Sequence, residues 1–173
     1  MTDSTTTPAP AGAAQRALDR LAGIAITISA IALVGIVVVQ GWQVFTRYVL
    51  NDSPSWTEPV TLLFLATAMS FGAAAGVHTN RHFGFYLLAE RLPAGVRRVL
   101  YVLRPLLVAA VGAMIAVWAC VLLQDGLDIR IAGAPMPQSI NYLPLGIGGA
   151  LICVFALYKA WLAALPPRDE KET

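Results

Sequence analysis

Charged side chains are scarce in this chain of 173 residues. Asp, Glu, Lys and Arg together make up 13% of the sequence, whereas hydrophobic residues make up 57%. A soluble globular domain carries about 25% charged residues, so the composition excludes an ordinary soluble domain and predicts that most of the chain lies in a lipid bilayer. The formal net charge of +2 is too small to indicate a nucleic-acid partner.

Residues with reactive chemistry are also few. Cys120 and Cys153 are the only cysteines, and both lie inside apolar runs, where we expect buried hydrophobic side chains rather than a disulfide. The sequence contains no nucleophile–base arrangement, no glycine-rich phosphate loop and no Cys-x-x-Cys motif. It therefore offers no candidate catalytic residue, favours a protein that is not an enzyme, and implies no cofactor.

His78 and His82 are the only histidines, and their spacing would place both on one face of a helix. Two axial haem ligands have to approach from opposite sides of the ring, which two histidines on one helix face cannot do. A zinc site needs further ligands, and the nearest acid, Glu90, lies eight residues beyond His82. We therefore expect a histidine pair near the membrane surface rather than a metal site.

Long hydrophobic runs dominate the rest of the sequence. A helix needs about 20 apolar residues to cross a bilayer core, and four runs are long enough. They predict an all-α membrane protein with four transmembrane helices, at about Leu21–Phe45, Pro59–Val77, Val99–Leu123 and Asn141–Leu162. The uncharged stretch from Leu21 to Thr46 is longer than the 7–15 residues that are typical of a signal-peptide core, so we expect it to stay uncleaved.

The lysines and arginines are unevenly distributed among the connections. Of the twelve, only Arg47 and Arg130 lie between the first and second spans or between the third and fourth. The positive-inside rule then places both termini in the cytoplasm. We expect a disordered cytoplasmic tail over residues 1–15, a four-helix membrane domain over residues 16–165 and a second cytoplasmic tail over residues 166–173.

The connection between the second and third spans, HTNRHFGFYLLAERLPAGVRR, combines apolar and basic residues. Its segment Phe83–Leu92 predicts a short amphipathic helix in the membrane interface, although an extension of a neighbouring span is an open alternative. The basic residues Arg91, Arg97 and Arg98 suit anionic lipid headgroups at the inner leaflet. Solvated charges that only orient the chain are the other interpretation.

The centre of every predicted span lacks Asp, Glu, Lys, Arg and His, the groups that usually mark a transport route. Small residues do recur every four positions, and such rows let helix backbones approach closely. These rows are Ala68, Gly72 and Gly76; Gly112, Ala116 and Cys120; and Gly146 and Ala150. They suit packing within the chain or against a partner, and the chain alone does not look like a complete transport pathway.

Three segments carry a resemblance to a known family. They are FTRYVLNDSPSWTE after the first span, GAAAGVHTNRHFGFYLL after the second, and APMPQSINYLPLGIG before the fourth. In this order, over about Leu21–Leu162, they resemble the small membrane subunit (DctQ-like) of tripartite ATP-independent periplasmic (TRAP) transporters. The residues that match are Arg47, Tyr48, Trp56, Glu58, Arg81, His82, Pro135, Met136, Tyr142, Pro144 and Gly146.

Two positions depart from the family pattern. Pro59 stands where the family often has a second acid, and Tyr86 stands where it often has an Asp. These departures affect any charge contact that the family makes at those positions, and they leave the expected fold unchanged.

The resemblance implies a scaffold role. In this family the small subunit carries no substrate site and braces the large permease subunit, while an extracytoplasmic binding protein delivers the substrate, usually an organic acid. It also implies a multi-pass location in a bacterial inner membrane, in contact with lipids. The candidate partner contacts are Arg47, Tyr48, Trp56, Glu58, Arg81, His82, Pro144 and Gly146.

Two functions from other classes are alternatives. A membrane-anchor subunit of a redox enzyme complex would reveal itself by the absorbance of a bound haem. A small channel needs a row of polar groups along one helix face through the middle of the membrane, and the sequence shows no such row.

Overall fold

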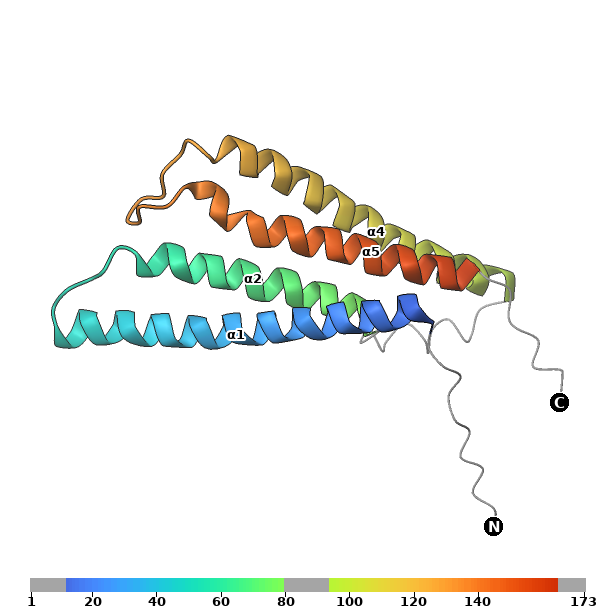
Figure 1. Cartoon of the computed structure of the whole chain (residues 1–173), viewed down its shortest axis with the longest axis horizontal. Helices are drawn as coiled ribbons and strands as arrows, with labels where there is room; N and C mark the ends of the chain where they lie inside the picture. The colour runs from blue at the N-terminus through green and yellow to red at the C-terminus, as the bar shows by residue number, and fades with distance from the viewer. Residues whose placement is uncertain (1–11, 80–93, 165–173) are drawn as a thin grey trace, which may run out of the picture.

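The computed structural model describes residues 12–79 and 94–164, which form four long helices (Figure 1). These are α1 (Ala13–Val49), α2 (Thr57–His78), α4 (Ala94–Asp125) and α5 (Leu143–Ala164), and a short 3-10 helix, η1 (Gln138–Asn141), precedes α5. All four long helices are sufficiently long and apolar to cross a membrane. The described part of the chain contains no strand, so the predicted all-α fold with four membrane helices is confirmed.

The four helices lie side by side in the order α1, α2, α5, α4 (Figure 1). α1 and α2 form one antiparallel hairpin, α4 and α5 form a second, and the two hairpins meet where α2 packs against α5. The chain therefore forms a row with two central and two outer helices. α1 has 37 residues, which corresponds to about 55 Å of helix, so it is longer than a bilayer core of roughly 30 Å.

Small residues hold the helices close together. A Cβ atom added to Gly112 of α4 would lie 2.8 Å from the backbone nitrogen of Cys153 in α5, and one added to Gly149 would lie 2.8 Å from the backbone nitrogen of Ala116. The backbones of α4 and α5 are thus in direct contact, as small-residue rows permit. A Cβ atom at Gly148 would lie 2.5 Å from the Cβ of Ser70, which brings α5 equally close to α2.

The chain's own core is narrow. In the part of the chain that the structure describes, most buried hydrophobic residues are alanines, and Phe155 and Thr57 are the largest fully buried side chains. Large apolar residues instead cover the outer surfaces, as a bilayer environment allows. This arrangement overturns one expectation, because Cys120 is exposed on α4, while Cys153 is half-buried and both thiols are free. Cys120 lies on the α4 surface that the other described helices leave uncovered.

Candidate functional site

Residues with functional chemistry gather at both ends of the helices. The loop end consists of residues 50–56, between α1 and α2, and residues 126–137, between α4 and η1. The terminal end consists of the start of α1, the end of α2, the start of α4 and the end of α5. Figure 1 shows the loop end and the terminal end at opposite ends of the long helices.

At the loop end, α1 stops abruptly at a reversal of the chain. The buried hydroxyl of Thr46 donates to the carbonyl of Gln43 at 3.0 Å, and the Asp52 amide donates to the Thr46 carbonyl at 3.1 Å. Asn51 has a φ of 53°, a left-handed conformation that Asn adopts more readily than most residues. These contacts fix the direction in which Arg47 and Tyr48 leave the last turn of α1.

The Trp-Thr-Glu sequence opens α2 with alternating burial. Thr57 is fully buried and its hydroxyl donates to the Pro54 carbonyl at 2.8 Å. Pro59 is buried in the first turn, where a missing backbone N–H costs nothing. Trp56 and Glu58 are exposed, and the carboxylate of Glu58 is favourable at the positive end of the helix dipole. The helix start thus presents one aromatic ring and one acid to the surroundings.

Residues 126–137 form a compact turn that leads into η1. The amide of Ile131 donates to the Met136 carbonyl at 3.0 Å, and the amide of Gln138 donates to the Ile129 carbonyl at 2.8 Å. Arg130 and Pro137 pair in a single antiparallel bridge within this turn.

The two connections of the loop end touch each other at Gly133. The Ser55 hydroxyl donates to the Gly133 carbonyl at 3.0 Å. Gly133 has a φ of 90°, and a Cβ atom there would lie 2.5 Å from the Ser55 carbonyl oxygen. Only glycine fits this position without strain. Gly133 therefore allows the two connections to come into contact, and this contact joins the two hairpins at the loop end.

The predicted partner contacts at the loop end divide into two groups. Arg47, Tyr48, Trp56 and Glu58 are all exposed, and no ion pair joins Arg47 to Glu58 in the part of the chain described. Pro144 and Gly146 instead pack inside the chain. Pro144 is buried, and a Cβ atom at Gly146 would lie 3.5 Å from the Cβ of Ala119 in α4.

At the terminal end, charged side chains join the helices. Nε2 of His78 lies 2.7 Å from Oδ1 of Asp19, which links the end of α2 to α1. The same imidazole lies with its centroid 4.9 Å from the ring of Phe155 in α5. Asp19 also accepts from the Gln15 amide at 3.2 Å. Thus His78 connects three helices, and the residues described contain no group of three His, Cys, Asp or Glu that could hold a metal.

Lys159 supplies a second link at this end. Its ammonium donates to the backbone carbonyl of Val77 in the last turn of α2. A cation at this position is favourable, because the carboxyl end of a helix carries a partial negative charge. Lys159 of α5 therefore caps the carboxyl end of α2, while Asp19 of α1 contacts the next residue of α2, His78.

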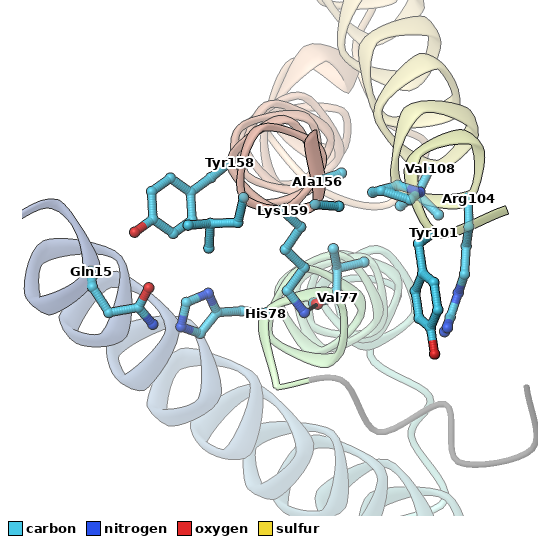
Figure 2. Close-up of a pocket in the computed structure, with 12 residues that line it drawn as sticks. Gln15, Val77, His78, Tyr101, Arg104, Val108, Ala156, Tyr158 and Lys159 are labelled. Carbon is cyan, nitrogen blue, oxygen red and sulfur yellow. Dashed lines mark hydrogen bonds between the residues drawn. The ribbon is translucent and has the colours of Figure 1, made fainter. Parts of the chain in front are cut away.

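A cavity of about 380 Å³ lies beside this link, and Figure 2 shows the residues that surround it. It is lined by residues of α2, α4, α5 and the first turn of α1. Its lining residues are Gln15, Val77, His78, Tyr101, Arg104, Pro105, Val108, Ala156, Tyr158, Lys159, Leu162 and Ala163.

Asp19, Arg104 and Lys159 are site residues that were not predicted from the sequence. Arg104 and Lys159 lie within the predicted spans, and a charge inside a span is a signal of function or pairing, but both were used only to orient the chain. Asp19 is 59 residues from His78 along the chain. The predictions for Phe83–Leu92, Tyr86, Arg81, His82 and Arg91 lie outside the described residues, as do the side chains of Arg97 and Arg98.

Comparison with known families identifies the chain. The family model described as "Tripartite ATP-independent periplasmic transporters, DctQ component" matches residues 36–165, about three quarters of the sequence. The match extends from the second half of α1 through α5 and includes both connections of the loop end. A comparison with individually curated proteins gives no match. The chain therefore belongs to the DctQ family and is a component of a TRAP transporter.

Proposed function

We propose that this chain is the small scaffold subunit of its transporter. In this role it braces a large permease subunit for the ion-driven uptake of an organic acid, which an extracytoplasmic binding protein delivers. The chain lies in a bacterial inner membrane with both termini in the cytoplasm. Family membership supports the transporter context, and the observation that carries the scaffold role is that most serine and threonine hydroxyl groups of the described helices bond to backbone carbonyls.

Most serine and threonine hydroxyl groups within the described helices bond to backbone carbonyls instead of facing a common route. Thr27 donates to Gly23 at 3.0 Å, Ser29 to Ala68 at 2.8 Å and Thr67 to Leu63 at 2.7 Å. The Ser70 hydroxyl is buried without a hydrogen-bond partner among the described residues, at the close contact with Gly148. A substrate pathway needs polar groups that can exchange partners, so this arrangement favours transport through another subunit.

The outer helices supply surface for that subunit. Val37 on α1 is 71% exposed and Val117 on α4 is 62% exposed. Gly23 and Gly41 also leave open space on α1, because a Cβ atom at either position would meet nothing within 4 Å. Small residues on a free helix surface allow a second helix to approach closely. A row with two free flanks is a suitable brace, and the loop-end residues Arg47, Tyr48, Trp56 and Glu58 suit contact with the binding protein or the permease.

An affinity purification tests this function directly. The full chain, tagged at its carboxyl terminus, is purified from gently solubilised native membranes, and its partners are identified by mass. We expect one large multi-span permease to be recovered in a fixed ratio. Recovery of a haem or flavin enzyme instead would favour the redox-anchor alternative, and recovery of the chain alone would contradict the scaffold role.

Photo-crosslinking then locates the permease. A photoreactive amino acid replaces Val37 in one variant and Val117 in another, and each complex is irradiated in native membranes. We expect a covalent adduct of the chain and the permease from at least one variant. Unirradiated samples serve as controls, and the absence of an adduct from both outer helices would contradict a brace that uses the flanks of the row.

A further inference from the structure

The cavity at the terminal end has two chemically different walls. Apolar side chains cover much of it, including Val77, Val108 and Leu162. Arg104 and Lys159 add two cationic groups, and none of the twelve described residues that line it is acidic. Two cations beside an apolar surface match the chemistry of an anionic lipid better than that of a neutral one.

The fold builds this combination from two helix faces. Tyr101, Arg104 and Val108 recur at helical spacing along α4, so they project into the cavity from one face. Lys159 enters from α5, and Figure 2 shows it pointing toward Val77 while Tyr101 and Arg104 lie side by side on α4. The contact of Lys159 with the Val77 carbonyl holds its ammonium at the cavity wall.

Position along the helices indicates which part of a lipid would lie here. Lys159 is five residues before the last residue of α5, which corresponds to about 7.5 Å of helix. A position this close to the end of a membrane helix suits the boundary between headgroups and acyl chains. The distribution of lysine and arginine predicts that this end faces the cytoplasm, where anionic lipids attract basic groups.

We propose that the cavity binds an anionic phospholipid. Its phosphate contacts the guanidinium of Arg104 and the ammonium of Lys159, and the start of an acyl chain lies against the apolar wall. Arg is well suited to this role because its planar fork donates two parallel hydrogen bonds to a phosphate. A cavity of about 380 Å³ lies in the size range of organic ligand sites. A free phosphate ion would leave its apolar wall without a contact, whereas an acyl chain would cover it. This site is independent of the scaffold role.

Native mass spectrometry of the full-length chain tests the proposal. The chain is delipidated in detergent and titrated with phosphatidylglycerol or with phosphatidylcholine that has the same acyl chains. We expect one phosphatidylglycerol to bind with about tenfold preference, which corresponds to about 1.4 kcal/mol. Both lipids carry a phosphate, but phosphatidylcholine adds a quaternary ammonium, and its positive charge is unfavourable beside Arg104 and Lys159. Equal binding of the two lipids would overturn the proposal.

Matched variants locate the binding site. In Arg104→Gln we expect the affinity for phosphatidylglycerol to fall about tenfold, and Arg104→Lys should restore part of it. Arg20→Gln removes an exposed positive charge from α1 outside this cavity and should bind the lipid as the original chain does. Equal losses in Arg104→Gln and Arg20→Gln would show a general charge effect and overturn the proposal.

Two further measurements separate lipid binding from misfolding and from the binding of a free anion. Circular dichroism of Arg104→Gln should match that of the original chain, and partial rescue by Arg104→Lys provides a second check on folding. Inorganic phosphate at millimolar concentration should not displace the lipid. If phosphate competes fully, the cavity is a site for a free anion and the lipid proposal is wrong.

Discussion

The helices are held together by different chemistry at the loop end and at the terminal end. At the loop end, backbone hydrogen bonds shape each connection, the contact of the Ser55 hydroxyl with the Gly133 carbonyl joins the two hairpins, and the charged residues Arg47 and Glu58 face outward. At the terminal end, side chains with ionisable groups make the links between helices, through Asp19 with His78 and through Lys159 with Val77.

This difference separates recognition from support. Neutral backbone contacts fix the shape of the loop end and leave its charges available to a partner. The terminal end uses charges to hold α1, α2 and α5 together and leaves a cavity next to them. Substitutions at the loop end should therefore affect partner binding or local geometry, whereas substitutions at the terminal end should affect helix association and lipid binding.

The largest effect is expected from Glu58→Lys at the loop end. Glu58 is exposed in the first turn of α2. Its interaction with the helix dipole contributes only about 0.3–1 kcal/mol to the stability of the chain. Placing a like charge in an interface costs several kcal/mol. We expect uptake by cells that contain the complete transporter to fall by about tenfold or more, with the chain still folded and inserted.

Asp52→Lys is the matched control for this change. Asp52 is also an exposed acid of the loop end, but it lies outside the Trp-Thr-Glu sequence. We expect its charge reversal to leave uptake within about twofold of the original. Unchanged uptake in Glu58→Lys, or an equal loss in Asp52→Lys, would contradict a specific contact at Glu58.

The next largest effect is expected from Gly133→Ala. Its φ of 90° and the 2.5 Å approach to the Ser55 carbonyl oxygen make any side chain strained, at a cost of about 1–3 kcal/mol. Gly23→Ala is the control, because it lies in the middle of a helix in open space and should be neutral or slightly stabilising. Thermal unfolding in detergent measures both variants, and equal melting temperatures would show that the loop end does not depend on glycine 133.

Much of the fold could be predicted from the sequence because hydrophobicity is a local signal. Three of the four predicted spans lie within the helix that the structure shows, and the fourth begins two residues before α5. The order α1, α2, α5, α4 could not be predicted, because every helix is apolar on most of its surface and pattern alone does not select neighbours. Close contacts such as Gly112 against Gly149 decide that order, and they appear only in three dimensions.

The site residues show the same difference between features that are local in the sequence and contacts that form only in the fold. Arg47, Tyr48, Trp56 and Glu58 were found because a short sequence segment contains them all, and the structure leaves all four exposed. Ser55 with Gly133 and Asp19 with His78 were missed because 78 and 59 residues separate the partners along the chain. Sequence proximity pointed to Glu90 as the acid nearest to the histidines, whereas the acid that contacts His78 lies near the start of α1.

The smallest effect is expected from breaking the Asp19–His78 contact at the terminal end. The side chain of Asp19 is 51% exposed, so solvent weakens the interaction and its coupling should be about 0.2–1 kcal/mol. A double-mutant cycle with Asp19→Ala, His78→Ala and the double variant, followed by chemical unfolding in detergent, isolates that coupling from the contact of His78 with Phe155. His78→Ala alone should cost more than Asp19→Ala, because it also removes a ring packed 4.9 Å from Phe155. A coupling of zero would show that His78 acts here through its packing against Phe155 and not through Asp19, and the charge-based distinction between the two ends would then rest on Lys159.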